Sequence, residues 1–61
     1  MNIYCLWQGE VLLVKSVNKV IATVMMVGDE PCMTFVDGVL ASLTFGEMEH
    51  IIDCWHNTPK S

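Results

Sequence analysis

Three side chains with metal-binding chemistry share one segment of the chain. Glu47, His50 and Cys54 are spaced three and four residues apart in EMEHIIDC, so a helix would point them the same way. Zinc accepts carboxylate, imidazole and thiolate ligands, but a structural zinc site uses four. The fourth would have to come from Cys5, Cys32 or a second chain. The spacing matches no established zinc motif, so we expect polar residues beside a half-buried thiol, and neither metal nor cofactor.

A second flank of the same segment carries Glu49, Asp53 and His56. Like charges four residues apart on a helix repel each other. A basic partner surface would remove this repulsion, and we therefore assign the three residues to partner binding. The plainer interpretation is a solvated acidic face.

The large side chains near the N-terminus extend this partner-binding set. Tyr4 and Trp7 fall on opposite faces of a regular strand. We expect one to lie in the core and the other at an interface, where tyrosine and tryptophan often dominate the binding energy. Met25 is added because methionine side chains make adaptable binding surfaces.

Catalytic chemistry has little support in the sequence. The chain contains no Gly-rich phosphate loop and no nucleophile motif, and its paired carboxylates Asp29 and Glu30 lie beside Pro31 in an expected turn. A chain of 61 residues has little room for a dry pocket with supporting residues. We predict no catalytic residue and no enzymatic activity.

Strand-forming segments occupy most of the chain and should position these residues. IYCLWQ, VLLVKS, KVIATVMMV, CMTFV and VLASL are separated by turn-forming residues and predict strands over about residues 2–43. The connections are too short for crossovers, so the sheet should be antiparallel. Asp37-Gly38 between two apolar runs predicts a hairpin.

The pattern then changes to that of one helix over about residues 44–56, followed by a short tail at 57–61. Thr44 and Glu47 have the spacing of a capping box, and Pro59 cannot continue a helix. The expected core-facing stripe lies within about 120° and comprises Phe45, Met48, Ile51, Ile52 and Trp55. The predicted fold is a single α+β domain over residues 1–61. A small antiparallel sheet of four to five strands precedes one C-terminal amphipathic helix.

The composition raises a packing problem. Hydrophobic residues make up 52% of the chain and charged residues only 16%. The segment KVIATVMMV is apolar on both faces of a strand, and a single helix can cover only one face of the sheet. The sheet could curl into a small barrel, two copies could pack together, or the face could serve a different protein.

The formal net charge is −4, with three lysines and no arginine. Direct nucleic-acid binding is therefore not expected, because it usually needs a basic patch. Three cysteines make a poor disulfide framework, and the N-terminus lacks the basic start and apolar run of a signal peptide. No apolar run reaches the length needed to cross a bilayer without interruption. We expect a cytoplasmic protein without membrane contact.

These observations favour a non-enzymatic protein that forms a homodimer and binds and blocks a larger protein, with nucleic-acid-handling proteins among the candidates. Short, acidic, apolar chains of this kind are typical of small accessory and inhibitor proteins, including viral ones, although this likeness assigns no role to any residue. One alternative is a small SH3-like or Sm-like barrel that binds a peptide or nucleic acid. The other is a metal-dependent regulator that uses His50 and Cys54.

Overall fold

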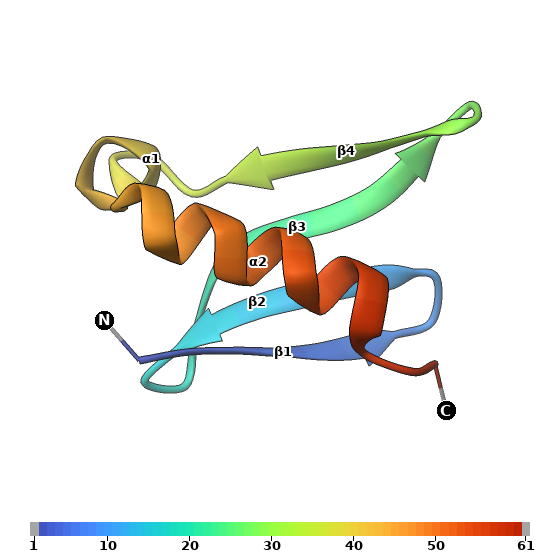
Figure 1. Cartoon of the computed structure of the whole chain (residues 1–61), viewed down its shortest axis with the longest axis horizontal. Helices are drawn as coiled ribbons and strands as arrows, with labels where there is room; N and C mark the ends of the chain where they lie inside the picture. The colour runs from blue at the N-terminus through green and yellow to red at the C-terminus, as the bar shows by residue number, and fades with distance from the viewer. Residues whose placement is uncertain (1, 61) are drawn as a thin grey trace.

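The computed structural model describes residues 2–60 and places one helix across one face of a four-stranded sheet (Figure 1). The elements are β1 (Ile3–Gln8), β2 (Val11–Ser16), β3 (Lys19–Val27), β4 (Glu30–Phe35), α1 (Val39–Ser42) and α2 (Phe45–Asn57). The strands pair in chain order and every pair is antiparallel. The predicted α+β class, with an antiparallel sheet followed by a C-terminal helix, is confirmed.

Two-residue turns connect the strands, and the least expected one joins β2 to β3. Val17 and Asn18 have φ angles of 50° and 65°. Positive φ at both central residues is the signature of a type I′ turn, whose twist matches that of the flanking strands. Valine is a poor residue for this region because its branched side chain crowds the backbone there. The pairing of β2 with β3 therefore holds Val17 in a conformation that its side chain disfavours.

The predicted hairpin at Asp37-Gly38 and the fifth strand over VLASL are wrong. Gly38 has a positive φ of 83°. Among residues 2–60, the residues other than glycine that have a positive φ are Val17 and Asn18, and Asp37 is not one of them. Asp37 therefore lacks the second positive φ that a type I′ turn requires. Instead of returning as a strand, the chain enters α1 at Val39, whose amide donates to the carbonyl of Val36 at 3.0 Å.

The start of α2 is fixed by the predicted capping box, which is confirmed. The hydroxyl of Thr44 accepts a hydrogen bond from the Glu47 amide at 3.1 Å, and the Glu47 carboxylate accepts one from the Thr44 amide at 2.8 Å. These bonds satisfy two amides that have no partner within the helix. The hydrogen bond from the Thr44 amide also holds the pKa of Glu47 below its usual value.

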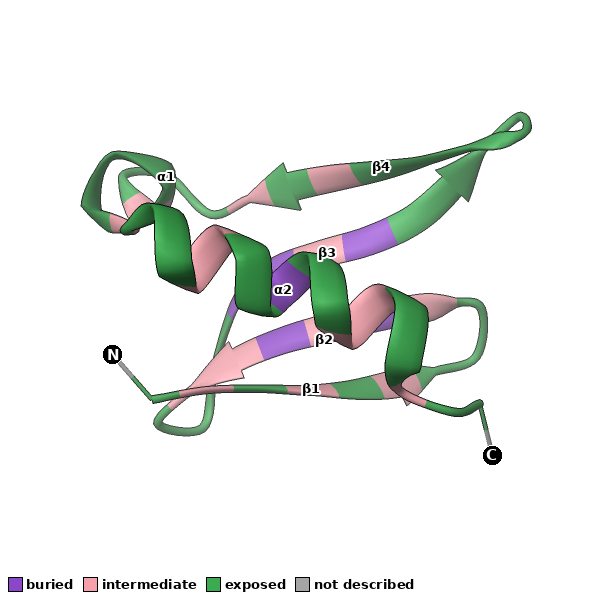
Figure 2. Cartoon of the chain, in the orientation of Figure 1, coloured by how far each residue is buried: buried purple, intermediate pink, exposed green. Residues whose placement is uncertain are grey.

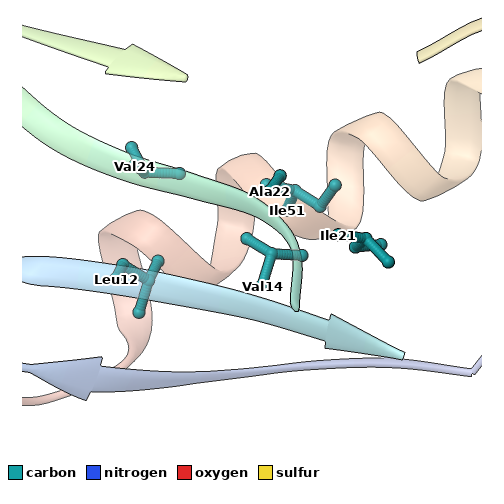
Figure 3. Packing of buried hydrophobic residues seen from close by; sticks show 6 residues of the cluster. All are labelled: Leu12, Val14, Ile21, Ala22, Val24 and Ile51. Carbon is teal, nitrogen blue, oxygen red and sulfur yellow. The ribbon is translucent and has the colours of Figure 1, made fainter. Parts of the chain in front are cut away.

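The core lies between α2 and the middle of the sheet (Figures 2 and 3). Its buried members are Leu12, Val14, Ile21, Ala22, Val24 and Ile51. Within the described chain, Ile51 is the one fully buried residue of α2, and Met48, Cys54 and Trp55 flank it half-buried.

The predicted core-facing stripe is correct at its centre and wrong at one side. Phe45 is 92% exposed and Ile52 is also exposed, although both were expected to face the core. The buried face of α2 is rotated toward Cys54, because the helix lies close to β1 while Ile51 reaches the middle of the sheet.

Two adjacent isoleucines provide a matched test of this packing. Truncation of a fully buried isoleucine should destabilise a protein by about 2–5 kcal/mol, because it removes transfer free energy and leaves a cavity. We therefore expect Ile51→Ala to remove most of the stability, whereas Ile52→Ala should cost less than about 1 kcal/mol. Urea unfolding followed by circular dichroism measures both values. Equal losses for the two variants would contradict the rotation of α2 described above.

Candidate functional site

The face of the sheet that points away from α2 carries many exposed apolar side chains. Paired residues lie on the same face, so the strand register assigns each side chain. We call this surface the open face; it consists of Tyr4, Leu6, Gln8, Val11, Leu13, Lys15, Val20, Thr23, Met25, Val27, Glu30, Cys32 and Thr34. All four strands contribute to it, and β3 crosses its middle.

Nothing among residues 2–60 covers the open face. Its large apolar side chains Tyr4, Leu6, Val20, Met25 and Val27 are between 39% and 58% exposed. The sheet also does not close, because β1 and β4 are its two ends and do not pair with each other in the described part of the chain. The expected alternative of a curled barrel is therefore not the observed architecture. The problem raised by KVIATVMMV remains in the folded chain: one face of β3 has no cover.

The open face is almost neutral although the protein is acidic. Lys15 and Glu30 are its charged residues. Lys15 pairs with Tyr4 near one end of the strands, and Glu30 pairs with Val27 near the other end. The other acidic residues occupy turns and α2, and they are Glu10, Asp29, Asp37, Glu47, Glu49 and Asp53. A second acidic molecule could approach this face without bringing many carboxylates together.

A second apolar surface is a groove between α2 and the hairpin formed by β3 and β4. It encloses about 160 Å³ and is lined by Val24, Pro31, Met33, Ile52, Trp55 and His56. Figure 1 shows why it exists: α2 runs diagonally, its C-terminal end lies toward β1, and the β3–β4 hairpin extends beyond it. The groove is thus the part of the helix-facing side that α2 leaves open.

Acidic residues are placed on both sides of this groove. Glu49 and Asp53 are exposed on the outer side of α2, and His56 lines the groove itself. Asp29 lies in the turn before β4, two residues from Pro31 in the groove wall. The described lysines lie elsewhere, two of them at the opposite end of the sheet and Lys60 near β1. The groove therefore combines an apolar floor with negatively charged surroundings.

The candidate metal ligands are engaged in other contacts. The Glu47 carboxylate belongs to the capping box, and His50 Nε2 is 3.1 Å from the carbonyl oxygen of Ile3. A carbonyl only accepts, so Nε2 carries hydrogen in this bond and offers no lone pair to a metal. Cys54 Sγ is 3.8 Å from the same nitrogen. Across residues 2–60 there is no group of three His, Cys, Asp or Glu side chains that could hold a metal ion.

Trp7 packs on the helix side of the sheet and fastens the C-terminal segment. Its ring centroid lies 5.2 Å from that of Trp55, and its Nε1–H donates to the Thr58 carbonyl at 2.8 Å. Lys60 Nζ lies 4.7 Å from the centre of a Trp7 ring and 2.8 Å from a carboxylate oxygen of Glu10. The hydrogen bond and charge of Lys60 hold the pKa of Glu10 below its usual value.

The residues predicted to bind a partner thus fall into three places. Tyr4 and Met25 lie on the open face, and the predicted separation of Tyr4 from Trp7 on opposite faces is confirmed. Glu49 and Asp53, together with the groove-lining His56, lie on the exposed side of α2, and Trp7 packs against Trp55 on the helix side of the sheet. Their binding roles remain predictions. Sequence reasoning did not name Leu6, Leu13 and Val27 on the open face or Pro31 and Met33 in the groove. Strand alternation could have indicated the first group, but the second depends on the diagonal position of α2.

No family model, curated protein or solved structure matches this chain. In the described residues no helix has both the length and the apolar character to span a membrane.

The contacts of Glu47 and His50 predict the response to a chelator. Because Glu47 and His50 Nε2 are engaged in contacts within the chain, and the described residues contain no group of three possible metal ligands, we expect EDTA to leave the melting temperature unchanged in differential scanning fluorimetry. Elemental analysis of the purified protein should show no stoichiometric zinc. A zinc content near one ion per chain, lost together with thermal stability on chelation, would contradict this expectation.

Proposed function

We propose that the protein is a non-enzymatic interaction protein that works as a homodimer and blocks or modulates a larger protein. The observation that carries the proposal is the open face, an uncovered apolar surface built from all four strands. Monomeric proteins rarely expose continuous apolar patches above a few hundred Å², and larger ones usually mark interaction sites.

The energetic argument compares this exposure with the stability of a small domain. Burying one large apolar side chain contributes about 1.5–3 kcal/mol. A domain of this size rarely has more than about 3–5 kcal/mol of stability in total. Several exposed side chains therefore represent a free energy comparable to the stability of the whole fold. Association recovers it only if many residues take part, because association itself costs roughly 4–15 kcal/mol.

A second copy of the chain is the occupant that the surface fits best. The Cα positions extend 27 by 22 Å along the two longer axes, and this broad side is the side that the sheet presents. A stable interface buries about 800 Å² on each partner, so a face of these dimensions must be covered almost completely by the second copy. Permanent homodimer interfaces are also the most apolar class, with charged residues depleted at their centre. The open face has both properties, and a two-fold axis would place it against itself.

The larger protein would then bind at the groove beside α2, which dimerisation through the open face leaves accessible. The apolar floor of the groove suits an apolar side chain, and Glu49, Asp53 and Asp29 around it suit a basic surface. Basic surfaces are the common feature of proteins that handle nucleic acid, and such proteins are therefore among the expected partners.

Two adjacent methionines test the dimer. Met25 and Met26 are 43% and 46% exposed but point to opposite faces of β3. We expect Met25→Glu to give a folded monomer, because it places a carboxylate in the centre of the proposed interface. Met26→Glu should remain dimeric. Size-exclusion chromatography with light scattering measures the mass, and circular dichroism verifies folding.

The same experiment can exclude the dimer. A wild-type protein that runs at its chain mass of 6.8 kDa over the whole concentration range would contradict it. Loss of the dimer in Met26→Glu but not in Met25→Glu would place the interface on the other side of the sheet. Val24→Glu serves as the unfolding reference, because Val24 is buried in the core.

An affinity experiment tests the proposed partner site. We expect Glu49→Gln/Asp53→Asn to capture less of the partner than the wild type, and to lose part of the salt dependence of capture, because it removes two charges beside the groove. Glu10→Gln/Asp37→Asn removes the same charge away from the groove and should behave like the wild type. Quantitative mass spectrometry of salt-eluted material measures the difference. Equal capture by both double variants would contradict binding at the groove.

A further inference from the structure

The seam between β1 and α2 has a regular register. His50 Nε2 donates to the Ile3 carbonyl at 3.1 Å, and Trp7 Nε1 donates to the Thr58 carbonyl at 2.8 Å. These contacts pair positions 50 and 58 of the chain with positions 3 and 7. Four helical residues advance about 6 Å, and two strand residues advance about 6.6–6.8 Å. Four residues of α2 therefore cover nearly the same distance as two residues of β1, and position 54 falls opposite position 5.

Both of these positions are cysteines. Cys5 and Cys54 are half-buried free thiols that pack against the same core cluster. The register places the two side chains opposite each other, and Cys54 Sγ lies 3.8 Å from His50 Nε2. Burial, followed by the hydrogen bond and charge of Cys54, raises the pKa of Cys5 to about 12. Cys5 is therefore held as a neutral thiol that faces Cys54.

We propose that Cys5 and Cys54 are a redox-sensitive pair that forms a reversible intramolecular disulfide when the protein meets a peroxide. Cys32 is excluded from this pair because it is exposed on β4, on the open face of the sheet. The inference does not rest on the proposed dimer or on the groove, because the seam lies within one chain.

The reaction with hydrogen peroxide balances in two steps. The deprotonated sulfur of Cys54 attacks one peroxide oxygen, the O–O bond breaks, and the departing oxygen takes up a proton and leaves as water. This step oxidises Cys54 to a sulfenic acid. The Cys5 sulfur then attacks the Cys54 sulfur, the S–O bond breaks, and the leaving oxygen takes the Cys5 proton and departs as a second water. Two thiols are oxidised to one disulfide, and one peroxide is reduced to two waters.

The order of the two cysteines follows from their surroundings. Cys5 keeps its proton and is poorly suited to attack peroxide, because the thiolate is the reactive form. His50 Nε2 donates to the Ile3 carbonyl and lies 3.8 Å from the Cys54 sulfur. Cys54 is half-buried beside the exposed His50, so a small oxidant can approach its sulfur from this side.

The bond would join the two layers of the fold. It would connect the edge strand β1 with the last turns of α2 and enclose most of the chain in one covalent loop. A cross-link between residues far apart in sequence restricts the unfolded chain strongly.

The test uses Cys32→Ser, which leaves Cys5 and Cys54 as the only thiols. After treatment with hydrogen peroxide, the protein is denatured and alkylated, and intact mass spectrometry counts the free thiols. We expect two free thiols before oxidation and none afterwards. The oxidised protein should have the mass of a single chain minus two hydrogen atoms. The melting temperature should rise by roughly 5 °C or more, and dithiothreitol should reverse both changes.

The double variants Cys32→Ser/Cys5→Ser and Cys32→Ser/Cys54→Ser serve as matched controls. Neither should show a reversible rise in melting temperature, because each lacks one sulfur of the pair. Two alkylated thiols after oxidation would overturn the proposal, as would a disulfide-linked pair of chains or stable sulfinic acids in place of the internal bond. These outcomes do not depend on whether the wild-type protein is a dimer.

Discussion

A single helix can cover only one face of a sheet, and this constraint determines the rest of the molecule. β3 is apolar on both sides, and α2 buries Val24 and Ala22 on one side while Thr23 and Met25 remain on the other. A larger domain would add a second layer of helices. Among residues 2–60 no further element packs on the second face, which is left as a surface. The exposed apolar residues of the open face therefore follow from the apolar pattern of the strands, not from loose packing in the core.

The diagonal position of α2 has an equally direct consequence. The helix is fixed at one end by the capping box of Thr44 and Glu47 and at the other by the contact of Trp7 with Thr58. The contacts of His50 with Ile3 and of Trp7 with Thr58 both join this segment to β1, so α2 leans toward β1 and away from β4 (Figure 1). This lean forms the groove beside Met33, brings Cys54 over Cys5, and turns Phe45 out into solvent. Three separate features thus have one geometric origin.

The sequence predicted the elements well because their signals are local. The strand boundaries at Gly9 and Gly28, the capping box and the apolar character of both faces of β3 depend on neighbouring residues. The errors arose where a local signal competed with tertiary structure. Asp37-Gly38 has the best hairpin composition, yet the type I′ φ angles occur at Val17 and Asn18, where strand pairing imposes them on an unsuitable valine. The groove and the facing cysteines could not be predicted, because both depend on the angle at which α2 crosses the sheet.

The three features of the molecule are mechanically connected through α2. The helix contributes Ile52 and Trp55 to the groove and Cys54 to the seam with β1, and these side chains move together because a helix of this length is rigid. A bond between Cys54 and Cys5 would fix the end of α2 on β1, on the side of the helix away from Pro31 and Met33. The open face belongs to the sheet alone and contains neither cysteine of the seam. The seam, the groove and the open face therefore lie on different sides of one small fold, and α2 is the element that the first two share.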